Sequence, residues 1–380
     1  MRWTPTHKEH EEDMRGRGID GAIQSARQML TIGFDGTSPT PEVRRFLGER
    51  GGGGYILFRR NIVDADQLLA LNRELRSLAV GLPVFAMVDQ EGGRVMRLRG
   101  IGSDVPPMSA LGNAGSVLHA RRMGELLGRE VHAVGFNVDC APVLDVHSNP
   151  DNPIIGDRAL GTDPEDVGRL GVAFIQGMHR SGVLTCGKHF PGHGDTLLDS
   201  HLALPRLEHD RSRLDAVELV PFREVFAKAP PALVMTAHVL YRGVDPDRPG
   251  TLSPVVIERL LRDELGYQGV VVTDDLEMKA LADRYSIEEI VRLGLEAGVD
   301  VFLCCKEEER WLRAEAELER LLVDSVVSPE RIQRSVRRIA RAKGPLRDAL
   351  VPDVDAASRV LRCAEHQEWL AQLDAACGTA

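Results

Sequence analysis

The stretch Gly182-Val-Leu-Thr-Cys-Gly-Lys-His-Phe-Pro-Gly-His-Gly-Asp-Thr196 joins a short apolar run to a glycine-rich loop. Residues 183–186 are apolar enough to form a buried strand, whereas the glycines and the proline that follow cannot continue a helix or a strand. The loop carries a lysine and two histidines, and Asp199-Ser-His201 follows shortly after it. A strand that ends in a loop of titratable groups is the expected position of an active site in an α/β protein.

The pattern of an apolar run followed by an amphipathic segment occurs eight times along the chain. The runs are almost continuously apolar, as is typical of buried parallel strands. An open doubly wound sheet is the alternative, but eight repeats without an early GxGxxG loop favour a closed barrel. We therefore predict an α/β fold, a single (β/α)8 TIM barrel with extra C-terminal helices. Strands are expected at 29–34, 55–58, 83–88, 138–143, 183–186, 232–235, 269–273 and 299–304. Helices are expected at 41–47, 64–75, 116–134, 164–178, 214–226, 253–265, 287–297 and 311–323.

The 380 residues are expected to form one catalytic domain with two flanking segments. Residues 1–28 read as a polar lead-in, and residues 29–345 as the barrel. Residues 346–380 are expected to be a helical extension packed on the outside of the barrel.

Composition narrows the class of protein. A hydrophobic content of 43% and a charged content of 27% are typical of a globular enzyme. The net charge of −10 argues against nucleic-acid and anionic-membrane partners, although it leaves room for a local basic pocket. No long apolar span or signal-peptide core is evident, and the six cysteines show no CxxC spacing. We therefore expect a cytoplasmic protein without nucleic-acid or membrane partners.

Polar side chains follow five consecutive apolar runs. The carboxyl ends of barrel strands all face one pocket, so these side chains are expected to converge there. This convergence is the strongest indication of an enzyme in the sequence. The residues are Asp89 and Arg97, Asp145 and Arg158, Lys188 and His189, His238, and finally Asp274, Asp275 and Glu277.

The chemistry that fits this set is a carboxylate paired with a proton carrier. Asp274 directly ends a strand, so it is rigidly held and suited to nucleophilic attack. Asp199 lies two residues before His201, close enough to fix the tautomer of an acid–base imidazole. Donors for ligand oxygens are expected at Arg97, Arg158 and Lys188, and an acceptor for hydroxyls at Asp89.

Several of these residues also have a purely structural interpretation. His193 could shape its loop through a backbone hydrogen bond, and His238 could be a satisfied core histidine. Asp195 could serve as a turn or N-cap residue, and Asp275 and Glu277 could cap the next helix or bind neighbouring backbone.

A zinc site is a further alternative, with His189, His193, His201 and Asp199 as ligands. These residues lie on a Gly/Pro loop, where no helix face fixes the spacing of the ligands. We expect no metal and no other cofactor.

Taken together, five blocks of sequence resemble the family 3 glycoside hydrolases, specifically their β-N-acetylglucosaminidase (NagZ-type) branch. The resemblance extends from about Met29 to Lys343. The blocks are Asp89-Gln-Glu-Gly-Gly-Arg-Val-Met-Arg97, Gly156-Asp-Arg158, Lys188-His-Phe-Pro-Gly-His-Gly-Asp-Thr196, Asp199-Ser-His201 and Val272-Thr-Asp-Asp-Leu-Glu-Met278.

The resemblance implies a retaining exo-β-N-acetylglucosaminidase that works through a covalent glycosyl–aspartate intermediate. Asp274 would be the nucleophile, and His201, tuned by Asp199, would be the acid–base. This pair departs from the usual two carboxylates. The implied substrate is a small carbohydrate or a cell-wall muropeptide during peptidoglycan recycling. Ring-binding residues would be Asp89, Arg97, Arg158, Lys188 and His189, with His193, His238 and Met278 in support.

Three points stay open at this level. A phosphorylase on the same scaffold is an alternative, since an imidazole does not repel phosphate as a carboxylate would, and a non-catalytic sugar-binding barrel is another. The C-terminal tail is longer than the family's minimal form, and we expect a monomer or a weak dimer. We also expect a loop swing that brings His201 into the pocket, because glycines at 187, 192 and 194 permit movement.

Overall fold

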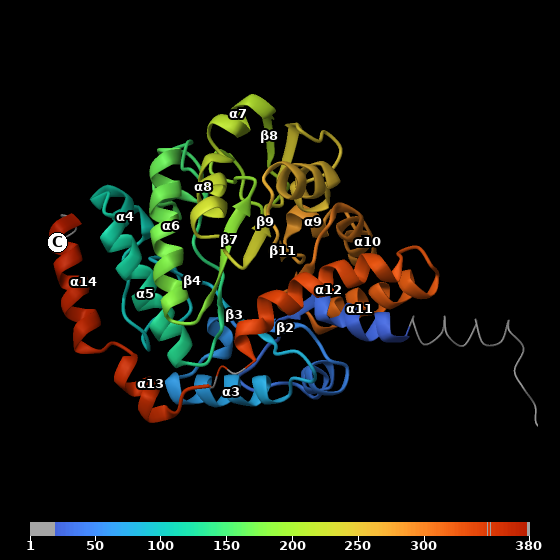
Figure 1. Cartoon of the computed structure of the whole chain (residues 1–380), viewed down its shortest axis with the longest axis horizontal. Helices are drawn as coiled ribbons and strands as arrows, with labels where there is room; N and C mark the ends of the chain where they lie inside the picture. The colour runs from blue at the N-terminus through green and yellow to red at the C-terminus, as the bar shows by residue number, and fades with distance from the viewer. Residues whose placement is uncertain (1–19, 348, 350, 378–380) are drawn as a thin grey trace, which may run out of the picture.

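A computed structural model describes residues 20–347, 349 and 351–377. Eight parallel strands close into a barrel in the order β1-β12-β11-β9-β7-β6-β3-β2, which confirms the predicted fold class (Figure 1). The strands are β1 (Leu30–Ile32), β2 (Gly54–Ile56), β3 (Phe85–Val88), β6 (Val138–Asp139), β7 (Leu184–Phe190), β9 (Leu233–Thr236), β11 (Val270–Asp275) and β12 (Val301–Cys304).

Each strand lies within a run that the apolar pattern predicts, or overlaps it closely. Every residue of β1, β2, β3, β6, β9 and β12 is buried, because helices cover the outside while side chains fill the inside. Strands β1, β3 and β6 are shorter than their runs, whereas β7 and β11 extend beyond theirs, to Phe190 and Asp275. The two longer strands thus carry polar residues of the predicted site within the barrel wall.

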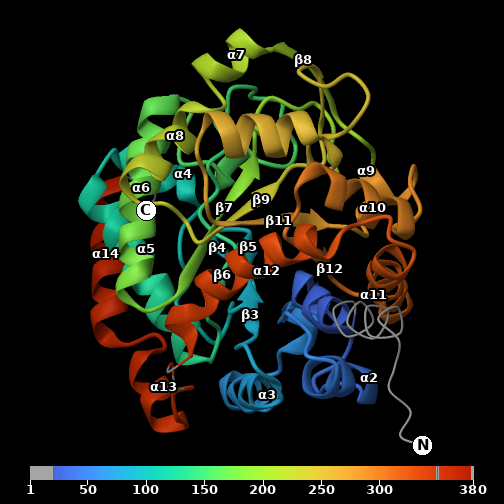
Figure 2. The same ribbon diagram turned by 45° about the vertical axis from the view of Figure 1, so that its right-hand side comes forward.

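The helices surround the strands (Figure 1). Several begin at side-chain caps: Asp64 accepts from the Gln67 amide, and Ser286 forms a capping box with Glu289. The helices that cover the barrel are α2 (Pro41–Arg44) continued by η2 (Arg45–Glu49), α3 (Ala65–Ser77), α5 (Val117–Ala133), α6 (Pro164–Arg180), α8 (Val220–Lys228), η6 (Val255–Glu264), α10 (Ile287–Ala297) and α11 (Glu308–Val323). The short helix α7 (Arg211–Ala216) lies beyond the ends of the barrel strands (Figure 2).

The predicted helix over 214–226 is wrong in detail. It is two helices, α7 and α8, separated by a turn over residues 217–219. Pro221 lies in the first turn of α8, where its missing N–H leaves no hydrogen bond unmade.

Several small elements were not predicted from the sequence. A hairpin of β4 (Gln90–Gly92) and β5 (Val95–Met96) follows β3, and helix α4 (Met108–Ala114) comes after it. Strand β8 (Arg206–Asp210) pairs in parallel with β10 (Leu240–Gly243), outside the barrel. Figure 2 shows β8 and α7 at the top of the molecule, beyond the ends of the barrel strands.

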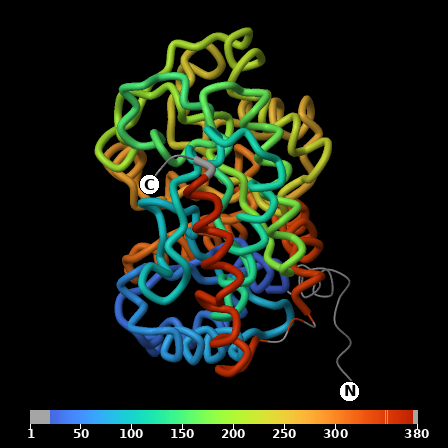
Figure 3. Tube along the Cα trace, turned by 90° about the vertical axis from the view of Figure 1, so that its left-hand side faces the viewer, coloured from blue at the N-terminus to red at the C-terminus, as the bar shows by residue number. Residues whose placement is uncertain are grey.

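The C-terminal part forms three helices on the outside of the barrel. They are α12 (Pro329–Lys343), which contacts β11, α13 (Val354–Val360), which contacts α3 and α5, and α14 (Ala364–Cys377), which contacts α4. Figure 3 shows this last part of the chain running along one side of the molecule. His366 anchors α14 through a 2.9 Å contact between its Nδ1 and Oε1 of the buried Glu130. The boundaries at 28/29 and 345/346 stay predictions. None of the helices in the described ranges combines the length and the apolar character that a bilayer crossing requires.

Candidate active site

A pocket of about 250 Å³ opens at the carboxyl ends of the barrel strands. It brings together residues that lie far apart in the sequence, as the strand-end pattern predicts. The predicted site residues that line it are Asp89, Arg97, Arg158, Lys188, His189, His193, His201 and Asp274.

Asp89 follows β3 and anchors two cations of the pocket. Its Oδ1 accepts from Lys188 Nζ at 2.9 Å, and its Oδ2 accepts from Arg97 Nη2 at 3.0 Å. The side-chain Oε1 of Gln90 holds the β4–β5 hairpin by accepting from the amides of Arg97 and Leu98. The hairpin therefore returns Arg97 to the side chain that it pairs with.

Glu91 is a pocket residue that sequence reasoning left without a role. Its carboxylate, which is almost fully buried, accepts two parallel bonds of 2.8 Å from Arg158, and its Oε1 lies 2.6 Å from Lys188 Nζ. Its place two residues after Asp89 was a signal, because a carboxylate buried at a strand end needs a cationic partner.

These ion pairs hold the cluster in its charged form. Burial disfavours the carboxylate of Asp89, but Lys188 and Arg97 lower its pKa below the ordinary value. Burial likewise disfavours the ammonium of Lys188, but the charges of Asp89 and Glu91 raise its pKa. The floor of the pocket is thus a preorganised group of three cations and two anions that can bond to the oxygens of a polar ligand.

Strand β7 sends two adjacent side chains into the same pocket. Successive side chains of a regular strand point to opposite faces. The pairing of β7 with β9 shifts register between Gly187 and Phe190, and this irregularity allows both Lys188 and His189 to line the pocket.

Asp145 positions the end of β7 and the loop that follows it through hydrogen bonds to His189 and His193. Its Oδ2 lies 2.7 Å from His189 Nδ1, and its Oδ1 accepts from the His193 amide at 2.6 Å. Asp145 is fully buried, and burial raises its pKa, but the charge and hydrogen bond of His189 bring the pKa below the ordinary value. The sequence placed Asp145 at a strand end but did not show its partners.

Asp274 lies in β11, half-buried, on the wall of the pocket. Burial raises its pKa, but the charges of His189 and His238 and the amide of Asp275 outweigh this and lower it. That amide donates to Asp274 Oδ1 at 2.8 Å. The side chain is therefore an ionised carboxylate with one oxygen engaged, which suits a nucleophile.

Asp199 and His201 form the hydrogen-bonded pair that their spacing predicts. His201 Nδ1 lies 2.8 Å from Asp199 Oδ1, and the same oxygen accepts from the His201 amide. Asp199 lies behind the imidazole and does not itself line the pocket, whereas His201 does. Because His201 already lines the pocket with Asp274 in this conformation, the loop swing stays a prediction about other conformations.

Two of the supporting residues lie outside the lining of the pocket. His238 is fully buried, with Nδ1 2.7 Å from Thr251 Oγ1 and Nε2 donating to the Asp275 carbonyl at 3.0 Å. Met278 is buried in the turn between β11 and the helix that follows it. Both stabilise the end of the strand that carries Asp274.

The Met278 amide donates to the Asp275 carbonyl at 3.1 Å, which closes that turn. Asp275 and Glu277 also act within it: Asp275 Oδ1 accepts from the Glu277 amide, and Glu277 Oε1 accepts from the amides of Lys306 and Glu307. Asp195 pairs with His209 Nε2 at 2.7 Å, outside the pocket lining. Asp275 and Glu277 thus bind nearby backbone amides, but the helix that follows them, α9 (Lys279–Ala282), has no side-chain cap. Asp195 bonds to His209 and Ser148 instead of capping a helix.

Within the described ranges, no group of three or more His, Cys, Asp or Glu side chains is arranged to hold a metal ion. The candidate zinc ligands have other partners. His189 is bonded to Asp145, and His193 is bonded to Ser200 and Thr196.

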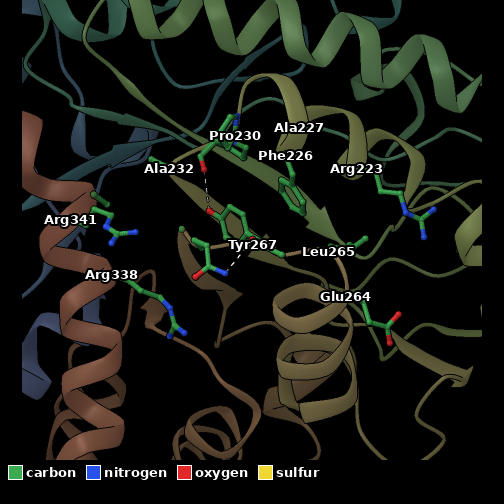
Figure 4. A pocket seen from close by; sticks show the side chains of 15 residues that line it. Arg223, Phe226, Ala227, Pro230, Ala232, Glu264, Leu265, Tyr267, Arg338 and Arg341 are labelled. Carbon is green, nitrogen blue, oxygen red and sulfur yellow. Dashed lines mark hydrogen bonds between the residues drawn. The ribbon is translucent and has the colours of Figure 1, made fainter.

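A larger cavity, of about 620 Å³, opens at the other end of the barrel, beside the residues that precede β9 and β11 (Figure 4). Phe226 and Tyr267 stack there with ring centroids 4.7 Å apart, and Arg338 and Arg341 approach from α12. Its described lining contains one carboxylate, Glu264, and no histidine. It therefore lacks the carboxylate and imidazole that the first pocket combines.

Comparison with known proteins gives a consistent result. Residues 24–342 match the family model described as the glycosyl hydrolase family 3 N-terminal domain. The chain is 35% identical over 342 residues to beta-hexosaminidase A of Pseudoalteromonas piscicida, covering 82% of this chain and 56% of that protein. It is 38% identical over 326 residues to a beta-hexosaminidase of Methylococcus capsulatus, covering 84% and 94%.

A solved structure, that of a glycoside hydrolase family 3 beta-N-acetylglucosaminidase from Paenibacillus sp., superposes with a TM-score of 0.88 at 40% identity, covering 93% of this chain and 68% of that one. The chain thus spans little more than half the length of the first of these relatives and most of the length of the second. Residues 24–342, which match the family model, contain every strand of the barrel and all the residues that line the pocket. The resemblance inferred from the sequence is confirmed, and the chain belongs to glycosyl hydrolase family 3.

Proposed function

We propose that this protein is a retaining exo-β-N-acetylglucosaminidase that removes a terminal, non-reducing N-acetylglucosamine. The observation that carries the proposal is the presence of Asp274 and the Asp199-bound His201 on one pocket of about 250 Å³. Relatives named beta-hexosaminidase and beta-N-acetylglucosaminidase support the choice of sugar.

In the first step, an oxygen of Asp274 would bond to the anomeric carbon while the glycosidic bond breaks. His201 would give the proton of Nε2 to the departing oxygen, because Nδ1 is engaged with Asp199. In the second step, His201 would take a proton from water, whose oxygen bonds to the anomeric carbon and releases Asp274. An imidazole avoids placing a second negative charge beside the nucleophile.

The ion-pair cluster would hold the sugar. Asp89, Arg97, Arg158 and Lys188 present oxygens and N–H groups that match hydroxyl and carbonyl oxygens, and His189 adds an imidazole. The pocket volume lies below the range of about 300–1,000 Å³ that is typical of drug-sized ligands, which fits a single ring. This size favours exo cleavage.

Cell-wall muropeptides and the cytoplasm are part of the same proposal. Cys140, Cys186, Cys304, Cys305 and Cys363 are free thiols, as is usual in a reducing compartment. We propose a monomer or weak dimer, without nucleic-acid or membrane partners. Cell fractionation and assays on purified muropeptides would test these points separately from the chemistry.

The central experiment compares Asp274→Ala with Asp283→Ala, a matched change of an exposed aspartate beyond the turn. We expect the first to lower release of nitrophenol from an aryl N-acetylglucosaminide by about a thousandfold or more. The second should keep the wild-type rate. A fluorosugar substrate should label Asp274, identified by peptide mass. Wild-type activity in Asp274→Ala, or labelling of another side chain, would overturn the proposal.

A phosphorylase is the second candidate, and the imidazole at the acid–base position is what favours it. A carboxylate there would repel phosphate, whereas His201 would not. Adding inorganic phosphate and measuring sugar 1-phosphate distinguishes the two: formation of the phosphate ester supports the phosphorylase, and its absence supports the hydrolase.

A further inference from the structure

Ser200 differs from its two neighbours in the Asp199-Ser-His201 triplet. Its exposed fraction is 2%, whereas the side chain of His201 is 60% exposed. The Ser200 hydroxyl lies 3.0 Å from His193 Nε2, and the Ser200 carbonyl accepts from the Ala280 amide at 3.1 Å. Ser200 is therefore bonded on both sides to other parts of the chain.

These two contacts tie together the loops after two barrel strands. His193 belongs to the loop after β7, and Ala280 belongs to the short helix α9 (Lys279–Ala282), which follows Asp274 and β11. Ala280 also packs against Leu204, four residues after Ser200. Ser200 thus connects the segment that carries the acid–base to the segment that carries the nucleophile.

The rest of the segment contributes little to this anchoring. In the described structure, the other hydrogen bonds of residues 197–203 join members of the segment to one another, such as the amides of Leu202 and Ala203 to the Asp199 carbonyl. The side chains of Leu197, Leu198 and Leu202 are exposed. Most of the hold on the segment therefore passes through Ser200.

His193 is itself fixed for this task. Its amide donates to Asp145, and its Nδ1 lies 2.8 Å from Thr196 Oγ1. Burial and the charge of His189 lower its pKa to about 4, so the ring is neutral near pH 7. A neutral imidazole has one donor and one acceptor nitrogen, and it meets two hydroxyl groups that can each take either role.

We propose that Ser200 is a positioning residue, a latch whose bonds to His193 and Ala280 hold the 199–201 segment so that His201 faces the pocket that contains Asp274. The inference rests on the proposed role of His201 as the acid–base. It assigns His193 to the latch instead of to the ligand, and it gives the middle residue of the triplet a function.

The test uses Ser200→Ala in the full chain, with Ser212→Ala as the matched control, since Ser212 is exposed at the start of helix α7 and donates to Asp210 at 2.7 Å. Activity is measured on phenyl and 2,4-dinitrophenyl N-acetylglucosaminides. Only the phenyl substrate, with its poor leaving group, needs the proton of the acid. We expect Ser200→Ala to lower kcat/KM on the phenyl substrate by about 10- to 100-fold and on the dinitrophenyl substrate by less than about threefold. Hydrogen exchange of the peptide covering 197–203 should become faster.

Thr196→Val provides a second variant, because it removes the partner of His193 Nδ1 and keeps the side-chain volume. It should change both readouts in the same direction. Equal losses on the two substrates, or wild-type kinetics with unchanged exchange, would overturn the latch.

His201→Ala, assayed in parallel, separates a failure of the proposed acid–base role from a failure of the latch. If the loss of kcat/KM in His201→Ala does not depend on the leaving group, the proposed acid–base role fails. If it does depend on the leaving group and Ser200→Ala does not, the latch alone fails.

Discussion

The molecule contains two aspartate–histidine pairs that have nearly the same bond length but differ in their surroundings. In the first, His189 Nδ1 lies 2.7 Å from Asp145; in the second, His201 Nδ1 lies 2.8 Å from Asp199. Asp145 is completely buried, whereas the side chain of His201 is 60% exposed. An aspartate–histidine pair alone therefore does not define a role, because burial and the remaining hydrogen bonds decide whether the imidazole can move and exchange protons.

The buried pair, Asp145 with His189, is held in place by several hydrogen bonds. Asp145 accepts from the His189 ring, from the His189 amide and from the His193 amide, so its carboxylate has few directions left for water. Among the described residues, the Asp199 carboxylate accepts hydrogen bonds from His201 alone, and its segment is largely exposed. The first pair suits a rigid wall of the pocket, and the second suits a proton carrier.

The largest expected effect on stability separates the pairs directly. Asp145→Ala should lower the free energy of unfolding by about 3–5 kcal/mol, because it leaves buried donors without their acceptor. Asp199→Ala, the matched control, should lower it by less than about 1 kcal/mol, as for an exposed pair. Urea titrations of both variants measure the difference, and equal losses would remove the contrast.

The largest effect on catalysis should come from the exposed pair. We expect His201→Ala to lower kcat/KM on an aryl substrate with a poor leaving group by about 10²- to 10⁴-fold with little change in Tm. His189→Ala should instead raise KM and lower Tm, because it removes a pocket wall. Steady-state kinetics and thermal unfolding of the two variants check this; the reverse assignment of KM and kcat effects would break the comparison.

The contribution of the buried pair to stability is expected to depend on pH in the acid range. The pKa of Asp145 is lowered in the folded state, so its contribution is present above the unfolded pKa of about 3.9 and is lost as the pH falls through the lower folded value. Asp145→Asn removes this titration and should therefore flatten the acid limb of the unfolding free energy below about pH 4. Unfolding measured across the acid range and at neutral pH gives the slope. An unchanged slope would mean that Asp145 does not contribute.

A smaller pH dependence of the free energy of unfolding, opposite in sign to that of Asp145, is expected at Asp275. Burial and the charge of Glu277 raise its pKa to about 7, so the folded state holds a proton that the unfolded state loses. Stability should consequently fall as the pH rises from about 4 to 7. Asp275→Asn keeps an oxygen for the amides of Glu277 and Cys305, and it should gain about 1 kcal/mol at about pH 7.5 and nothing at about pH 4. A gain that is equal at both pH values would contradict this origin.

Much of the fold could be predicted because its signals are local. The apolar runs located all eight strands. The helices predicted over 64–75 and 253–265 do begin beside those first residues, where the Asp64 and Ser253 side chains accept from the amides of Gln67 and Val256. The parallel pairing of β8 with β10 was missed, since those strands are short, exposed in part and distant in sequence. The single helix predicted over 214–226 is divided because Pro221 fits the first turn of a helix but not its interior, so a new helix starts beside it.

The site was predicted only as a set of residues that share one end of the barrel. Strand ends indicated Asp89, Lys188 and Asp274, because the topology of a barrel brings such positions together. Sequence reasoning could not show that Glu91 would engage Arg158, 67 residues away, or that Asp145 would hold the amide of His193, 48 residues away. No local pattern encodes a contact of that span.

The amino-acid sequence by itself determined the alternation of strands and helices along the chain, the helix caps, and which polar residues stand at each strand end. These follow from side-chain polarity and backbone preference over a few neighbouring residues. Only the tertiary structure decided which carboxylate became a buried anchor and which stayed beside an exposed histidine, as Asp145 and Asp199 show. The physical reason is that burial and hydrogen-bond saturation depend on what the rest of the barrel places around a group.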